Sequence, residues 1–301
     1  MAAAIKQRTI TVKGFRIHTL DAGVGDPPVV LLHGLPTNVF LWRNIIPRVA
    51  QATRVVAFDL LGCGQSDKPL QTAYTVPAHA AILAGVLNAL KVARPLLVGM
   101  DLGLIVALHY ALQQPADIRG LVMFEGFFLP TKEMLRRQSL LSRLIMGCLY
   151  HRTLAEKVLV QSPTVIRQML IDGTVRTLTA DELQAYTTPL ADGALRRNLW
   201  LDGIGPYTLQ HPTDDPSDVS HCIDRYAAAL RHSPLPKLLL YAQPGMTVTE
   251  KTVRYARQQL SDLDCRSVGR GKHFLPEDQP EALAEEITAF VERVRDLTPS
   301  S

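Results

Sequence analysis

Val98-Gly99-Met100-Asp101-Leu102-Gly103 is the stretch on which the fold of this chain depends. It joins an apolar run at 95–98 to a segment with helical character at 102–113. Glycines on both sides of Asp101 let the backbone turn sharply from strand to helix, as in a nucleophile elbow. Such a turn holds its central residue in a strained conformation with the side chain exposed above the sheet. A carboxylate there can attack carbon and form an ester, although a surface aspartate at a helix N-terminus is the alternative.

Apolar strands alternate with helical segments on both sides of this turn. Strands are expected at 8–12, 15–19, 29–32, 54–58, 95–98 and 121–124. Helices are expected at 42–50, 79–90 and 102–113. The first two strands form a hairpin, whereas the later alternation predicts a mostly parallel sheet with helices on both faces. Ligands of such sheets bind beyond the carboxyl ends of the strands.

The pattern changes at residue 129. From 129 to 218 no clear strand is found, helical periodicity is evident at 134–150, and prolines divide the remainder into short pieces. Alternation resumes with strands at 237–241 and 263–268 and helices at 249–260 and 278–294. We therefore predict one α/β core domain, 1–128 and 219–301, with an inserted helical cap at 129–218. A helical elaboration packed beside the sheet is the alternative, but the insertion directly follows a strand's carboxyl end, which favours a cap over the site.

The composition limits the compartment and the partners. The net charge of +4 comes from 32 basic and 28 acidic residues spread along the chain, with no basic cluster interleaved with aromatics, so we expect no nucleic-acid partner. No apolar run reaches membrane-spanning length, and residues 1–8 lack the apolar region of a signal peptide. The cysteines are far apart and form no CxxC pair: Cys63, Cys148, Cys222 and Cys265. Free thiols in a reducing compartment are therefore expected, and no metal site is expected from the cysteines. We also expect no membrane partner, and the default localisation is cytoplasmic.

An aspartyl ester needs a base that activates water, and histidine suits this task at neutral pH. His273 follows the last expected strand in the glycine-rich segment 269–274, from which its side chain can reach back over the sheet. The other histidines considered lie in expected helices or in the hairpin, where packing or solvation explains them: His18, His79, His109 and His232. His273 is therefore the predicted base.

The base in turn needs a carboxylate that holds its tautomer. Glu125 directly follows the strand at 121–124 among apolar neighbours, where an unpaired acid is costly to bury. The alternative, Glu250, is more typical of an acid in the first turn of a helix. The backbone N–H groups of Leu35 and Leu102 are predicted to form an oxyanion hole, with His33 fixing the loop.

These residues occur in segments that resemble the haloalkane dehalogenase family of α/β-hydrolases, an Asp-nucleophile group that includes epoxide hydrolases. The similar segments are His33-Gly34-Leu35-Pro36-Thr37, 41–47, 59–69, 99–103, 232–239 and 271–278. The resemblance implies an α/β-hydrolase fold with Asp101 as nucleophile, His273 as base and Glu125 as the acid. It implies no cofactor and no metal.

Two positions depart from the family. Members carry Asn or a similar donor at the position of Leu35 and Trp at that of Leu102, whose side-chain N–H groups bind the departing halide. Leucine donates no side-chain hydrogen bond, and losing one donor to a developing anion costs about 2.7–4 kcal/mol. The related epoxide hydrolases instead use cap tyrosines to protonate the ring oxygen. This chain offers Tyr150, Tyr186 and Tyr207, although for any single one of them ordinary half-buried packing is the favoured interpretation.

The sequence thus favours a cofactor-independent hydrolase that attacks an electrophilic sp3 carbon of a small apolar substrate, in an epoxide or similar strained ring. A dehalogenase with a rebuilt halide site is the nearest alternative. A cofactor-free decarboxylase, cyclase or oxygenase on the same scaffold and a non-catalytic ligand-binding protein are the others. The combination of Asp101, Glu125 and His273 argues against the last, because a receptor needs no such set.

Overall fold

The computed structural model describes residues 4–138, 151–162, 164–202 and 218–295. Within these residues the strands form one sheet in the order β1-β2-β4-β3-β5-β6-β7-β8. Their bounds are β1 (Lys6–Val12), β2 (Phe15–Ala22), β3 (Val29–Leu32), β4 (Val55–Phe58), β5 (Leu96–Met100), β6 (Gly120–Phe124), β7 (Lys237–Pro244) and β8 (Leu263–Gly271). β1–β2 and β2–β4 pair antiparallel and the other neighbours pair parallel, so the predicted mostly parallel α/β sheet is confirmed.

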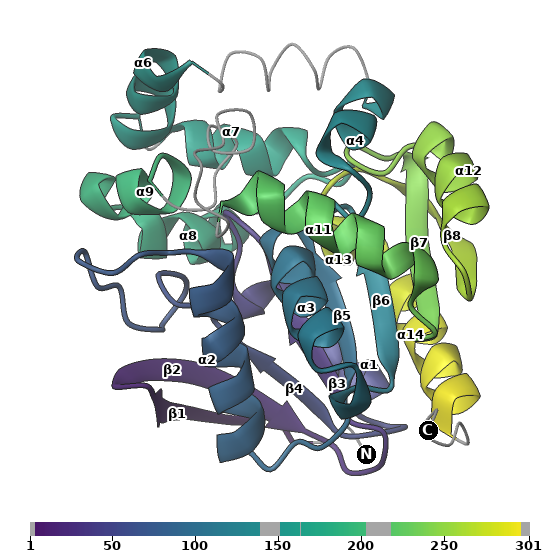
Figure 1. Cartoon of the computed structure of the whole chain (residues 1–301). Helices are drawn as coiled ribbons and strands as arrows, with labels where there is room; N and C mark the ends of the chain where they lie inside the picture. The colour runs from purple at the N-terminus through teal and green to yellow at the C-terminus, as the bar shows by residue number, and fades with distance from the viewer. Residues whose placement is uncertain (1–3, 139–150, 163, 203–217, 296–301) are drawn as a thin grey trace.

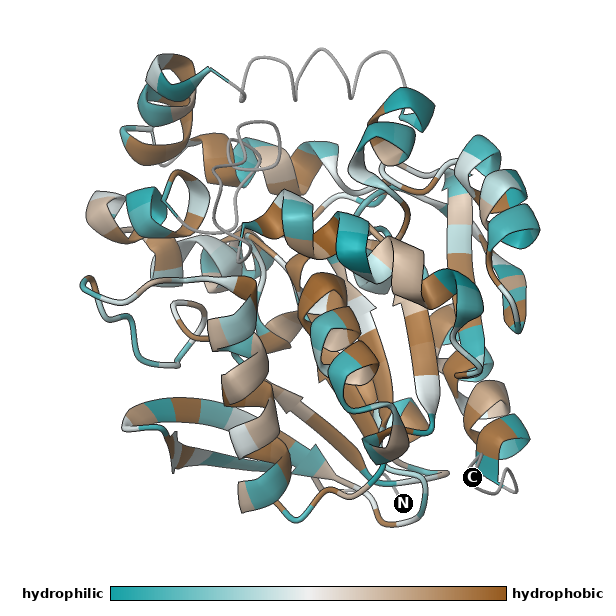
Figure 2. Cartoon of the chain, in the orientation of Figure 1, coloured by the Kyte–Doolittle hydropathy of each residue, from teal (hydrophilic) through white to brown (hydrophobic). Residues whose placement is uncertain are grey.

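Helices cover both faces of the sheet (Figure 1). One face carries α2 (Val76–Ala89), α3 (Asp101–Gln113), α11 (Val219–His232) and α12 (Glu250–Gln259). The other carries α1 (Ile46–Val49), α14 (Pro280–Arg295) and the short α13 (Leu275–Asp278). The hydropathy colouring in Figure 2 shows the central strands as hydrophobic and much of the outward helical surface as hydrophilic.

Alternate residues of each central strand enter two different cores, because neighbouring side chains of a strand point to opposite faces. In β3, Val30 and Leu32 pack on the α3 side, whereas Val29 and Leu31 pack on the α14 side. All four are fully buried. Burial on both faces explains why these strands are continuous apolar runs in the sequence.

The helices between β6 and α11 lie at one end of the molecule, beyond the carboxyl ends of the parallel strands (Figure 1). They are α4 (Thr131–Arg137), α6 (Arg152–Ala155), the π-helix η3 (Glu156–Val160), α7 (Thr164–Asp172), α8 (Ala180–Thr187), the 3₁₀ helix η4 (Thr188–Leu190) and α9 (Gly193–Trp200). This arrangement supports the proposed cap, 129–218. In the described part of the chain no helix is long and apolar enough to cross a bilayer.

Several expected boundaries were wrong. The helix expected at 42–50 is instead a 3₁₀ helix, η1 (Val39–Trp42), followed by α1, because Pro47 lacks the N–H that a continuous helix would need. The strand expected to end at 268 continues to Gly271, since β7 pairs with it past a register shift. The helix expected at 134–150 ends at Arg137, and 139–150 lie outside the described residues.

Of the cysteines, Cys63, Cys222 and Cys265 form no disulfide with any described residue, and Cys148 lies in the range not described.

Candidate active site

Asp101 lies at the sharp turn between β5 and α3. Its φ of +48° is in the left-handed region that non-glycine residues rarely adopt, which confirms the strained conformation expected for an elbow. Two glycines make room for this turn. A Cβ on Gly34 would lie 2.3 Å from the Asp101 Cβ, and one on Gly103 would lie 2.3 Å from the Leu32 carbonyl oxygen. The first turn of α3 can therefore approach β3 and the loop after it closely.

The carboxylate of Asp101 is held by backbone amides on one side and left open on the other. The N–H of Leu35 donates to Oδ1 at 2.9 Å, and the N–H of Leu102 also donates to the carboxylate. Burial raises the pKa of Asp101, but His273 and these amides outweigh burial and lower it, so the group is a carboxylate at neutral pH. Its side chain remains 33% exposed. An anion that is oriented yet accessible has the properties of a nucleophile.

His33 holds the loop that presents the Leu35 amide. Its Nδ1 lies 3.0 Å from the Gly34 carbonyl oxygen, and its Nε2 accepts the Leu60 N–H at 3.0 Å. Burial is the main cause that lowers the His33 pKa, so the ring is neutral and donates through Nδ1. This is the loop-fixing arrangement expected from the sequence.

His273 follows β8 and lies between two carboxylates. Its Nε2 is 3.6 Å from Asp101 Oδ2, and its Nδ1 is 3.4 Å from Glu125 Oε2. Both contacts are long for hydrogen bonds, as is common before substrate closes a site. Burial lowers the pKa of His273, but the two carboxylates raise it further, to about 9. The imidazole is therefore protonated at neutral pH while Asp101 is charged.

Glu125 is fully buried and fixed by three consecutive amides. The N–H groups of Met246, Thr247 and Val248 donate to its two carboxylate oxygens at 2.7 to 3.3 Å. Those amides follow β7, so two neighbouring strand ends place this acid against the imidazole. The rival Glu250 is exposed at the start of α12 and bonds to Gln243 instead. The structure brings Glu125, and not Glu250, to His273.

The proposed cap is hydrogen-bonded directly to the segment that carries His273, a connection that the sequence did not indicate. Asp278 accepts the N–H groups of Val175 and Arg176 through Oδ1, at 2.7 and 3.1 Å, and that of Lys272 through Oδ2 at 3.0 Å. The Phe274 N–H also donates to the Gly173 carbonyl at 2.9 Å. The segment 173–176 thus holds the residues on both sides of the imidazole.

Of the three candidate tyrosines, the structure describes Tyr186, and its hydroxyl bonds to a residue other than Asp101. Tyr186 is fully buried, and its hydroxyl donates to Glu277, which also pairs with Arg43 and Arg176. The candidate role of Tyr186 as a proton donor to substrate is therefore wrong. Its buried hydroxyl needs a hydrogen-bond partner, and Glu277, held in place by the two guanidinium groups, provides one. Tyr150 and Tyr207 lie outside the described residues.

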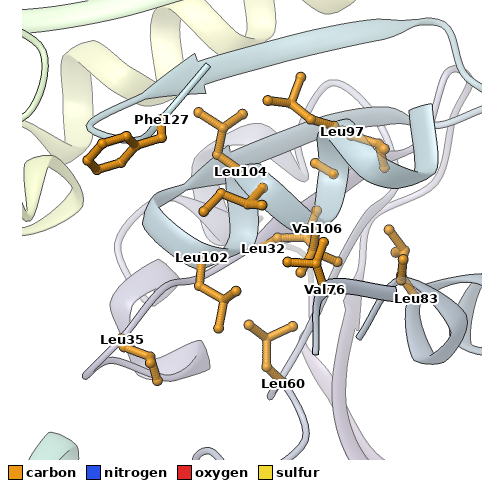
Figure 3. Close-up of a cluster of buried hydrophobic side chains, with 14 of the residues drawn as sticks. Leu32, Leu35, Leu60, Val76, Leu83, Leu97, Leu102, Leu104, Val106 and Phe127 are labelled. Carbon is orange, nitrogen blue, oxygen red and sulfur yellow. The ribbon is translucent and has the colours of Figure 1, made fainter. Parts of the chain in front are cut away.

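The side chains of Leu35 and Leu102 are buried, at 7% and 3% exposed. Figure 3 shows them with Leu60 at one end of a cluster of hydrophobic side chains. Around the elbow these two positions therefore contribute backbone N–H groups and hydrocarbon surface. Among the residues with described positions, no group of three or more His, Cys, Asp or Glu side chains could hold a metal ion.

Comparison with known proteins gives the same architecture. Residues 27–280 match the family model of the α/β-hydrolase fold. A haloalkane dehalogenase of Mesorhizobium japonicum is 31% identical over 98% of this chain and 94% of its own length. One of Sphingobium indicum is 30% identical over 96% of each chain.

Solved structures agree over nearly the whole chain. The haloalkane dehalogenase DatA from Agrobacterium tumefaciens C58 superposes with a TM-score of 0.83 at 28% identity, covering 97% of both chains. DbeA from Bradyrhizobium elkani USDA94 gives a TM-score of 0.85 at 28% identity, covering 97% of this chain and 99% of its own. The chain belongs to the haloalkane dehalogenase family of enzymes with the α/β-hydrolase fold.

Proposed function

We propose that this protein hydrolyses a small apolar substrate through an ester on Asp101. The observation that carries the proposal is an accessible carboxylate, held by two backbone amides, with His273 between it and the buried Glu125. The Asp101 oxygen attacks an sp3 carbon, and the bond to the leaving group breaks with its electron pair. This divides one difficult displacement into two easier steps.

Formation of the ester changes the state of the base. When Asp101 becomes a neutral ester, His273 loses one of the two carboxylates that raise its pKa and gives up its proton. If the substrate is an epoxide, the oxygen of the opened ring takes up the proton that His273 gives up. If the substrate is a haloalkane, the halide leaves as an anion and that proton goes to solvent. The neutral imidazole then removes a proton from water.

The resulting hydroxide attacks the ester carbonyl, and the Leu35 and Leu102 amides stabilise the negative charge on its oxygen. The acyl–oxygen bond then breaks, and the proton of the new carboxyl group passes to the departing alkoxide. Asp101 and the protonated His273 are restored. A panel of epoxides, haloalkanes and lactones, with intact-protein mass measured after rapid quenching, tests this scheme: absence of any adduct and of any product would overturn it.

The substrate we propose is an epoxide or a similar strained ring. The support is that both side chains at the expected halide positions, Leu35 and Leu102, are buried hydrocarbon. Ring strain supplies driving force that does not depend on those donors. The second candidate, dehalogenation at a rebuilt halide site, is favoured by the full-length similarity to haloalkane dehalogenases.

The two candidates differ in the effect of adding halide donors. Leu35→Asn with Leu102→Trp is expected to increase bromide release from a bromoalkane by about 10- to 100-fold over the unmodified protein, because each new N–H group can stabilise the departing anion. Each single variant is expected to give a smaller increase. Ion chromatography of bromide measures the rate directly.

Tryptophan is much larger than leucine, and overpacking costs about 1–3 kcal/mol, so thermal melting of each variant is the parallel control. Leu102→Phe adds bulk without a donor and separates the two effects. Rapid bromide release by the unmodified protein would reverse the order of the two candidates.

The connection between the cap and the base gives another prediction. Asp278→Asn replaces one of the two oxygens that accept the Val175, Arg176 and Lys272 amides with an NH₂ group, which is expected to displace the His273 segment. A misplacement of about 1 Å costs about 100-fold in rate, so ester hydrolysis should slow 10- to 100-fold while ester formation changes little. Stopped-flow measurement of the two phases distinguishes them.

Asp262→Asn is the matched control, since Asp262 lies in an exposed ion pair with Arg293 and is remote from the base in the fold. Equal slowing of both phases by Asp278→Asn would mean that this carboxylate supports the whole site and not the base in particular.

A further inference from the structure

A hollow of about 640 Å³ lies between the N-terminal hairpin and the cap, apart from the Asp101 site. Its walls come from β1 and β2, from η1 and α1, from the loop after β4, and from α8 and η4. In Figure 1 the hairpin and α8 lie on the same side of the molecule. Neither Asp101, Glu125 nor His273 is among the residues that line it. This volume falls within the range of small-molecule sites.

A buried histidine faces this hollow with one ring nitrogen unused. His18 lines it, is only 5% exposed, and places Nδ1 3.0 Å from Asp59 Oδ2. Asp59 is 1% exposed and also accepts the N–H groups of Val39 and Gln65, each at 2.8 Å. In the described part of the molecule Nε2 of His18 has no hydrogen-bond partner.

The Asp59 carboxylate determines whether Nε2 of His18 donates or accepts a hydrogen bond. Because Asp59 accepts hydrogen bonds from two amides, it is an acceptor toward His18, and Nδ1 must carry the proton. In the neutral ring, Nε2 is then an acceptor fixed in direction by its partner. A hydroxyl group that donates a hydrogen bond is the complementary ligand group.

The remainder of the lining favours a neutral, apolar ligand body. Val39, Phe40, Leu20 and Pro189 provide hydrocarbon surface. The one guanidinium in the lining, that of Arg43, is already paired with Glu182 at 2.6 Å and with Glu277 at 2.7 Å. With this cation neutralised, the described residues of the lining offer no unpaired positive charge for an anion.

We propose that this hollow is a second ligand site, which binds a small neutral alcohol or phenol through a hydrogen bond from its hydroxyl group to Nε2 of His18. The ligand contacts both the core hairpin and α8 and therefore bridges core and cap. The proposal is independent of the chemistry at Asp101, because it requires none of the residues around that carboxylate.

Phenol and anisole are the test ligands, since anisole has a similar ring but no hydroxyl hydrogen. With the full chain labelled with 15N, phenol is expected to shift the amide resonances of Val39, Gln65 and Ala185. Anisole is expected to bind these positions about 5-fold more weakly, the effect of losing one hydrogen bond. The comparison leaves the protein unchanged, which avoids a His18 variant that would remove the imidazole partner of the buried Asp59.

Ala185→Trp fills the hollow from α8 and is expected to abolish the shifts at Val39 and Gln65. Ala180→Trp is the matched control: the same substitution on the same helix, at an exposed residue outside the lining. Equal affinities for phenol and anisole would overturn the role of His18. Shifts confined to the Leu35 and Leu102 amides, or no shifts at all, would overturn the site.

Discussion

His273→Gln is expected to trap the protein as a covalent ester. Attack by Asp101 needs only a carboxylate, and the amides of Leu35 and Leu102 still donate hydrogen bonds to that group when the imidazole is gone. Activation of water needs the base, whose loss typically slows a step by about 100- to 10,000-fold. Ester should therefore accumulate to one equivalent while turnover falls by that factor.

Intact-protein mass after incubation with substrate measures the adduct. An epoxide adds its whole mass, because no atom leaves, whereas a haloalkane adds its alkyl group with loss of the hydrogen halide. The same experiment therefore distinguishes the two substrate classes. His232→Gln, at an exposed position at the end of α11, is the control and should turn over normally. Full turnover by His273→Gln would remove this residue from the base role.

Glu125→Gln is expected to lower turnover by about 10,000-fold, as loss of the carboxylate typically does when a base depends on it for its tautomer. The pKa of His273 should also fall below about 9, because Glu125 is one of the groups that raise it. Glu250→Gln, which alters an exposed acid at the start of α12, should be nearly silent. Rates of single turnover and the pH dependence of ester hydrolysis measure both effects.

A second consequence follows from the environment of Glu125. Its oxygens accept amides of three consecutive residues, and a glutamine would turn an NH₂ group toward those donors. An unsatisfied buried donor costs about 1–3 kcal/mol, so the melting temperature of Glu125→Gln should fall as well. Kinetics measured well below that temperature keep the two effects separate. If Glu250→Gln were the slower variant, the acid would belong to the segment after β7.

The sequence alone determined those features of the protein that follow from local patterns and from the order of elements. Glycines around Asp101 predicted the elbow, and alternation of apolar strands with helices predicted the mostly parallel sheet. Asp101, Glu125 and His273 each follow a strand, and the carboxyl ends of parallel strands meet at one edge of the sheet. Their approach could therefore be expected before any distance was measured.

Only the tertiary structure decided the partners that come from distant segments. Tyr186 was a possible proton donor to substrate until its hydroxyl was found bonded to Glu277, 91 positions away. The amide of Thr247 that holds Glu125 lies 122 positions along the chain, and the cap amide of Val175 is 103 positions from Asp278. Periodicity and turn residues report only on neighbours in the sequence, whereas a buried polar group binds whichever donor or acceptor packing places beside it. For that reason the residues of the candidate site could be predicted from the sequence, whereas the distant groups that hold them in place could not.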